Sequence, residues 1–222
     1  MTVRIAPSLL AADFARLADA VQLAEEGGAD LLHVDVMDGH FVPNLTMGPP
    51  VVAALAKVTR LPLDVHLMIE NPEATLPRYL DAGANWISVH VEATRHLQRC
   101  LDLIRRGGAR AGAAINPGTP TRTLQAVSLD LDYAVVMSVN PGWGGQPFLA
   151  PSIAKVRLLH GELLAAGSRA SIEVDGGVEP SNAGDLAAAG AEILVAGTAI
   201  YGQDDVKGAI ERLRLATRTV RA

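Results

Sequence analysis

The stretch Leu31–Asn44, LLHVDVMDGHFVPN, places polar residues in a segment that otherwise has the composition of a buried strand. Alternate residues of a strand face the same side, so His33, Asp35 and Met37 are expected on one side of it. A buried carboxylate without a partner is costly. The stretch therefore predicts a strand whose polar side meets specific partners, and those partners must come from elsewhere in the chain.

Seven further segments have the same strand-like composition, and most are separated by segments of helical period. With residues 31–37, the candidate strands are 3–9, 62–69, 86–92, 111–116, 133–139, 171–176 and 192–197. The clearest helix is 13–30, in which Phe14, Leu17, Val21 and Ala24 share one face and Gly27 or Gly28 ends the pattern. Residues 48–62, 152–167 and 181–190 are further expected helices, and 212–222 is expected to be a final helix with a solvated face.

This alternation of strand and helix, repeated eight times, predicts an α/β fold with a parallel sheet. Eight units in 222 residues fit a single (β/α)8 TIM barrel, with residues 1–222 as one domain. An open doubly wound sheet is the alternative. The barrel is favoured by the count of eight and by the polar residues, which fall at the C-terminal ends of several strands, where barrels carry their active sites.

The composition narrows the classes of partner and compartment. The net charge of −5 argues against non-specific binding of nucleic acid or membranes. The one cysteine, Cys100, excludes an internal disulfide and a thiolate metal cluster, which is compatible with a reducing, cytoplasmic location. No signal peptide is expected at the N-terminus, and no apolar run reaches the roughly 20 residues that cross a bilayer.

Two imidazoles and two carboxylates are expected to converge near the barrel mouth. If the polar faces of these strands point into the barrel, they bring together His33, Asp35, His66 and Asp175. Such a set suits a divalent ion such as Zn²⁺, Fe²⁺, Mn²⁺ or Co²⁺, which would neutralise the carboxylates and use the imidazole lone pairs. The alternative interpretation is that the histidines are hydrogen-bonded residues of the core.

Other polar residues near these strands are expected in supporting roles. Asp64 and Glu173 lie deeper along their strands and are expected to support neighbours rather than react. His90 and Glu92 share a face and could join the site, but a structural or supporting role is favoured. Asp38 has the opposite parity and is expected to be a turn residue. His40, His96 and His160 are expected at the surface.

Glycine-bearing turns follow the last three strands: NPGWGGQPF (140–148), DGGV (175–178) and AGTAI (196–200). Glycine lets the backbone approach an anion closely, and barrels often bind phosphate after strands seven and eight. We therefore expect phosphate binding near Gly176, Gly177, Gly197 and Thr198, with Thr198 opening the last helix; ordinary turn chemistry is the alternative. The glycines of 141–148 also suggest a mobile lid.

Six motifs together resemble the ribulose-phosphate 3-epimerase family. They are APSLLAADF, HVDVMDGHFVPN, DVHLMI, MSVNPGWGGQ, EVDGGV and VAGTAI, which occur in family order from Ser8 to about Ile200. The resemblance implies a metal-dependent isomerase that interconverts D-ribulose 5-phosphate and D-xylulose 5-phosphate at carbon 3 through an enediolate, in the pentose phosphate pathway or the Calvin cycle. It also implies a homo-oligomer, commonly a dimer or hexamer.

The resemblance also implies residue roles. It assigns one divalent ion per subunit to His33, Asp35, His66 and Asp175, and makes Asp35 and Asp175 the acid/base pair. The substrate contacts that it implies are Ser8, Met37, His66, Met68, Met137, Gly142, Gly144, Gly145, Gly176, Gly177, Gly197 and Thr198. The three methionines could instead be plain core residues. Trp143 stands where the family more often has Phe, and Thr198 where Ser is also common.

Inversion at carbon 3 without tumbling of the intermediate needs two groups on opposite faces, which Asp35 and Asp175 can supply. A Schiff-base aldolase needs a lysine at a strand end, but Lys57, Lys155 and Lys207 all fall in expected helical segments. A metal-dependent sugar-phosphate decarboxylase would also place a lysine near the site. An epimerase for another ketose phosphate, such as allulose 6-phosphate, and a non-catalytic phosphosugar-binding barrel remain as alternatives.

Overall fold

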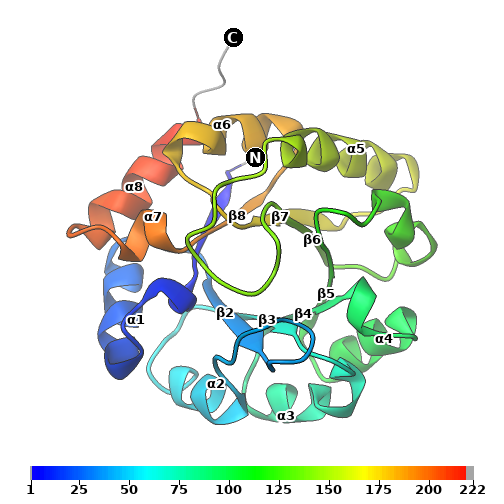
Figure 1. Ribbon diagram of the computed structural model, residues 1–222, viewed down its shortest axis with the longest axis horizontal. Helices are drawn as coiled ribbons and strands as arrows, with labels where there is room; N and C mark the ends of the chain where they lie inside the picture. The colour runs from blue at the N-terminus through cyan, green and yellow to red at the C-terminus, as the bar shows by residue number, and fades with distance from the viewer. Residues whose placement is uncertain (1, 219–222) are drawn as a thin grey trace.

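The computed structural model describes residues 2–218, and eight parallel strands enclose its centre (Figure 1). They are β1 Arg4–Pro7, β2 Leu32–Met37, β3 Leu63–Met68, β4 Trp86–His90, β5 Arg110–Ile115, β6 Tyr133–Met137, β7 Ser171–Asp175 and β8 Ile193–Ala196. Their order is β1-β8-β7-β6-β5-β4-β3-β2, and a parallel bridge between Ser8 and His33 joins the two end strands. The expected (β/α)8 barrel is confirmed.

The α-helices form a ring around the outside of the strands (Figure 1). They are α1 Leu17–Glu26, α2 Pro49–Leu55, α3 Leu76–Asp81, α4 Leu97–Arg106, α5 Pro151–Ala165, α6 Pro180–Ala189, α7 Thr198–Tyr201 and α8 Val206–Ala216. Of the expected final helix 212–222, residues 219–222 lie outside the described residues, as does Met1. Within residues 2–218, none of the helices combines the length and apolar character that crossing a membrane requires.

The first helix begins later than the sequence pattern indicates. Phe14 lies in a 3-10 turn, Phe14–Arg16, whose start is capped by the Asp13 carboxylate accepting from Ala15 N at 3.0 Å. The helix proper begins at Leu17, and Val21 is buried in the core. The expectation that Phe14 shares a helix face with Leu17, Val21 and Ala24 is wrong, because Phe14 lies in the 3-10 turn before the helix and is 45% exposed.

Two other segments are less helical than expected. The link from β5 to β6 is a 3-10 helix, Thr121–Val127, which begins directly after Pro120. α2 ends at Leu55, so Lys57 lies in a turn and not in a helix as predicted. Lys155 is on α5 and Lys207 on α8, so none of the three lies at the C-terminal end of a strand.

The barrel interior is filled by inward side chains of alternating strand positions. Toward the strand N-termini the interior is apolar and aromatic, and the ring centroids of Trp86 and Tyr133 lie 5.0 Å apart. The register pairs His33 with Asp64 and Asp35 with His66, which places the polar residues of β2 and β3 side by side. The outward positions pack against the helices and form the larger part of the core. The polar residues are thus gathered inside the barrel, toward the strand C-termini.

Candidate active site

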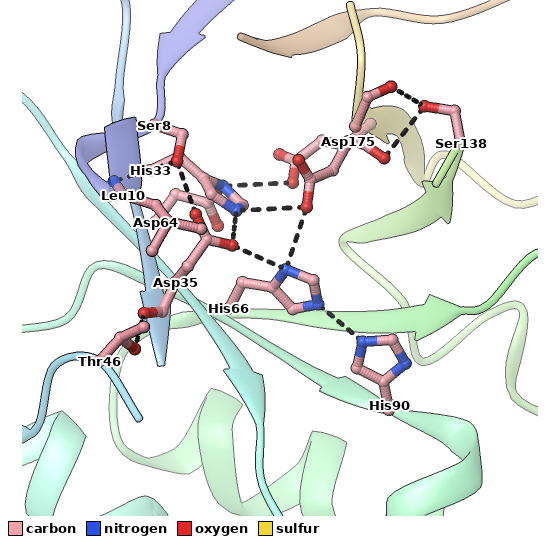
Figure 2. Close-up of polar contacts among 12 residues, drawn as sticks. Ser8, Leu10, His33, Asp35, Thr46, Asp64, His66, His90, Ser138 and Asp175 are labelled. Atoms are coloured by element: carbon pink, nitrogen blue, oxygen red, sulfur yellow. Dashed lines mark hydrogen bonds and ion pairs between the residues drawn. The ribbon is translucent and has the colours of Figure 1, made fainter. Parts of the chain in front are cut away.

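Four side chains from three strands point at one another near the barrel mouth (Figure 2). They are His33 and Asp35 of β2, His66 of β3 and Asp175 of β7. Asp35 Oδ1 lies 3.4 Å from His33 Nε2 and 3.6 Å from His66 Nδ1, and Asp175 Oδ2 lies 3.8 Å and 3.3 Å from the same two nitrogens. One donor atom from each of the four lies within 4.8 Å of the others.

This cluster fits a divalent cation. His33 Nε2 and His66 Nδ1 are buried and have no hydrogen-bond partner among the described residues, although each faces two carboxylate oxygens. Two free imidazole nitrogens and two carboxylates directed at a common point are a donor set that first-row divalent metals accept. Buried polar atoms are normally hydrogen-bonded. The unpartnered nitrogens therefore argue against the alternative that His33 and His66 are hydrogen-bonded residues of the core.

The electrostatics of the cluster favour an added positive charge. Burial lowers the pKa of His33, but Asp35 and Asp64 raise it well above its usual range. The pKa of His66 is likewise lowered by burial and raised further by Asp175 and Asp35, with a net rise. Burial raises the pKa of Asp35, but the two histidines bring it below its usual range. The site therefore attracts a cation, whether protons or a metal ion.

His33 is oriented on its Nδ1 side by the buried carboxylate of Asp64. Its Nδ1 lies 2.6 Å from Asp64 Oδ2, and the Tyr133 hydroxyl donates to Asp64 Oδ1 at 2.9 Å. Glu173 is fully buried with both oxygens unpartnered, and burial and the nearby Asp64 raise its pKa well above the usual range. Asp64 supports His33, as expected from its deeper position, whereas Glu173 Oε1 lies 3.7 Å from His33 Nδ1 without a hydrogen bond.

His66 has a different support. Its Nε2 lies 2.9 Å from His90 Nε2, and His90 Nδ1 lies 3.1 Å from Glu92 Oε2. Burial lowers the pKa of His90 to about 4. Burial raises the pKa of Glu92, but hydrogen bonds from His90, Thr119 and Asn116 together lower it to about 2. His90 and Glu92 are therefore outside the four-residue cluster but are connected to it.

Ser8 and Thr46 hold the end of β2. The Ser8 hydroxyl donates to Asp35 Oδ2 at 2.6 Å, and Thr46 Oγ1 donates to the Asp35 carbonyl at 2.5 Å. Thr46 also accepts from Met37 N at 3.0 Å. Thr46 could not be identified from the sequence, because it lies 11 residues beyond Asp35 and belongs to no motif. Asp38 is the expected turn residue, accepting from His40 N at 2.9 Å.

Ser138 is a second residue with a role that the sequence does not reveal. Its hydroxyl lies 3.0 Å from the carbonyl of Asp175 and 2.6 Å from that of Gly176, so it fixes the turn that carries the Asp175 side chain. Ser138 is fully buried at the end of β6. The one available signal was its position, directly after the inward-facing Met137.

A cavity of about 60 Å³ lies above the cluster, at the barrel mouth. Of the residues expected to contact substrate, His66 lies beneath the cavity and the others line it. The lining residues are Ser8, Met37, Met68, Met137, Gly142, Gly144, Gly145, Gly176, Gly177, Gly197 and Thr198. Asp35 and Asp175 form part of its wall. The carboxylates are therefore open to the cavity, while both histidines are fully buried below it.

The loop after β6 covers this cavity, and in Figure 1 it crosses the barrel mouth. A Cβ on Gly142 would lie 3.3 Å from Pro43 Cδ, so the loop packs against the segment that follows β2. Trp143 in this loop is 53% exposed. Thr198 opens α7, a helix of four residues, and not the last helix as expected.

Comparisons of the sequence with known proteins point to one family. The sequence profile of the family described as "Ribulose-phosphate 3 epimerase family" matches residues 4–201. The ribulose-phosphate 3-epimerase of Bacillus subtilis (strain 168) is 48% identical over 213 residues, which cover 96% of this chain and 98% of that protein. The ribulose-phosphate 3-epimerase of Aquifex aeolicus (strain VF5) is 43% identical over 210 residues, or 95% of each chain.

A likeness to solved structures extends to more distant barrels. Thiamine phosphate pyrophosphorylase from Pyrococcus furiosus has a TM-score of 0.68 to this structure at 14% identity, with 100% of this chain and 98% of that chain covered. At this level of identity the likeness concerns the fold alone.

Proposed function

Since this chain belongs to the ribulose-phosphate 3-epimerase family, we propose that it interconverts D-ribulose 5-phosphate and D-xylulose 5-phosphate by inverting carbon 3. The observation that carries the proposal is the placement of Asp35 and Asp175, which come from β2 and β7 and both border the cavity. Two carboxylates from separate strands can flank a flat intermediate, which a single base cannot do.

We propose that His33, Asp35, His66 and Asp175 hold one divalent ion, Zn²⁺, Fe²⁺, Mn²⁺ or Co²⁺. When bound, such an ion supplies positive charge beside the substrate oxygens on which negative charge develops as the carbon acid ionises. The two unpartnered imidazole nitrogens support this assignment.

In this proposal one aspartate takes the proton from carbon 3, and the other returns a proton to the opposite face of the enediolate. The hydrogen bond from Ser8 and the two imidazoles favour the charged form of Asp35, which suits it to begin as the base. Asp175 then carries the proton that is delivered. In the reverse direction the two exchange roles, as microscopic reversibility requires.

The cavity wall supplies the remaining contacts. Gly144, Gly145, Gly177, Gly197 and Thr198 are proposed to surround the phosphate with backbone N–H groups and one hydroxyl. The inward methionines of β2, β3 and β6 are proposed to enclose the reacting carbons in an apolar wall. The loop after β6 covers the cavity and would keep water from the enediolate.

A substrate panel tests the proposal. Purified protein loaded with each candidate divalent ion would be assayed with D-ribulose 5-phosphate and D-allulose 6-phosphate. The proposal expects the higher kcat/KM with ribulose 5-phosphate, and loss of turnover in both Asp35→Asn and Asp175→Asn. A preference for allulose 6-phosphate would indicate the related epimerase. Binding of both sugars without turnover in metal-loaded wild-type protein would indicate a phosphosugar-binding barrel.

A further inference from the structure

The two histidines of the cluster are oriented by unlike partners, and the partner of His66 is another histidine. Figure 2 shows the contact between the rings of His66 and His90, which join Nε2 to Nε2 at 2.9 Å. The ring centroids are 5.0 Å apart and the planes differ by 20°. Such values describe two nearly coplanar rings that meet edge to edge, the arrangement in which an N–H of one ring points at the lone pair of the other.

We propose that His90 is a positioning residue, which fixes His66 with its proton on Nε2 and its Nδ1 lone pair directed into the cluster, and that Glu92 fixes His90 in turn. The inference rests on the proposed metal site. A neutral imidazole carries one N–H and one lone pair. If His66 Nδ1 is a ligand, its proton is on Nε2 and is donated to His90 Nε2. His90 then holds its own proton on Nδ1, where Glu92 Oε2 accepts it at 3.1 Å.

The opposite direction of hydrogen bonding, in which His90 donates to His66, is disfavoured by the same geometry. If His90 Nε2 donated to His66 Nε2, the proton of His66 would lie on Nδ1 and would block that nitrogen as a ligand. The Nδ1 lone pair of a neutral His90 would then face the Glu92 carboxylate at 3.1 Å, where two acceptors repel each other. The first direction avoids this contact between two acceptors, and the second does not.

Glu92 is itself held from the neighbouring strand. Its Oε1 accepts from Asn116 N at 3.0 Å and from the Thr119 hydroxyl, both in the segment that follows β5. His90 is fully buried, and the ring of Phe41 packs against it at 4.9 Å. The relay from Glu92 through His90 to His66 is therefore held at its outer end by the segment after β5, so its orienting effect can reach His66. Residues behind a metal-binding histidine typically contribute about 10–100-fold to metal affinity.

The first test is Zn²⁺ binding to three variants, measured by competition with a chromophoric chelator. His90→Phe keeps a flat ring but removes the acceptor, and we expect it to weaken Zn²⁺ binding by about 10–100-fold. His90→Gln, whose amide can accept from His66 and donate to Glu92, should recover most of the loss. His96→Phe is the matched control, since His96 is exposed on the adjacent loop, and it should bind as wild type does. Unchanged affinity in folded His90→Phe would overturn the proposal, as would a wild-type protein that binds no Zn²⁺.

The second test needs no substitution and covers the case in which His90→Phe does not fold. Nitrogen-15 NMR of the Zn²⁺-loaded wild-type protein reports which ring nitrogen of each histidine carries the proton. We expect the proton on Nε2 of His66 and on Nδ1 of His90. A proton on Nε2 of His90 would contradict the relay. Neither test uses a sugar phosphate, so a failure of the proposed epimerase activity would leave both results interpretable.

Discussion

The hydroxyl of Ser8 donates a 2.6 Å hydrogen bond to Oδ2 of Asp35, at the place where β1 and β2 close the barrel. The bond is buried and its acceptor is a carboxylate, so it belongs to the stronger class of hydrogen bonds. It links the closure of the fold to the orientation of a proposed acid/base group. Loss of the Ser8 hydroxyl should therefore affect both stability and turnover.

We predict that Ser8→Ala lowers the free energy of unfolding by about 1.5–3 kcal/mol, the range for hydrogen bonds to charged groups. It should also lower kcat/KM, because Asp35 is less firmly oriented. Urea denaturation and steady-state kinetics measure the two effects. Ser181→Ala is the control, since Ser181 donates to Glu179 Oε1 at an exposed position. Equal effects of the two substitutions would contradict the special role of Ser8.

Tyr133→Phe should destabilise the protein by about 1–3 kcal/mol, because it leaves a buried acceptor of Asp64 without its donor. The ring and its contact with Trp86 are retained, so cavity formation does not contribute. Tyr201→Phe provides the comparison, since that hydroxyl donates to the neutral carbonyl of Ala20 at 3.2 Å. Thermal and urea denaturation should rank Tyr133→Phe as the more damaging change, and the reverse ranking would be inconsistent with an ionised Asp64.

Gly177 and Gly167 have similar positive φ angles but different surroundings. Substituting each with alanine therefore distinguishes the cost of backbone strain from the cost of steric contact. Gly177 has a φ of 64° and Gly167 a φ of 70°. A Cβ at Gly177 would lie 2.8 Å from Phe148 N, whereas one at Gly167 would meet nothing within 4 Å. Gly167→Ala should cost about 1–2 kcal/mol from the left-handed backbone alone. Gly177→Ala should cost more and should also lower kcat/KM, because Gly177 borders the cavity.

Glu92 should give the protein an acid-sensitive component of stability. Its pKa in the folded protein is about 2, below its usual 4.5, so the ionised form stabilises the fold. That stability is fully present above pH 4.5 and is lost as the pH falls toward 2. The stability difference between wild type and Glu92→Gln, measured by urea denaturation, should therefore shrink from pH 7 to pH 3. Glu211→Gln, on an exposed position of α8, controls for the loss of one negative charge, and a difference that grows on acidification would contradict this account.

The sequence pattern was sufficient for the barrel and for the core of the candidate site. Two-residue periodicity put His33 and Asp35 on the inward side of β2, and the same rule placed His66 and Asp175. The common feature is that each residue lies in a strand, where direction follows from parity alone. The glycines after the later strands were likewise found from their local turn chemistry.

Residues whose roles depend on tertiary contacts were not predictable in this way. Thr46 and Ser138 act by hydrogen bonds to backbone carbonyls of β2 and of the turn after β7, which no local pattern reveals. Phe14 has the right spacing for a helix face, but the Asp13 cap starts a 3-10 turn there and the α-helix begins only at Leu17. The relay from His66 to Glu92 crosses from β3 to the end of β4 and required the distances themselves.

The two-carboxylate mechanism is the central claim, and isotope exchange tests it most directly. Metal-loaded wild-type protein would be incubated with D-ribulose 5-phosphate in deuterium oxide, with and without a chelator, and the first D-xylulose 5-phosphate formed would be examined by NMR. The account predicts chelator-sensitive product with deuterium at carbon 3, because the returning proton comes from a second, solvent-equilibrated carboxyl group. Product that keeps its original hydrogen at carbon 3 would contradict it, since one group would then have carried the proton between both faces.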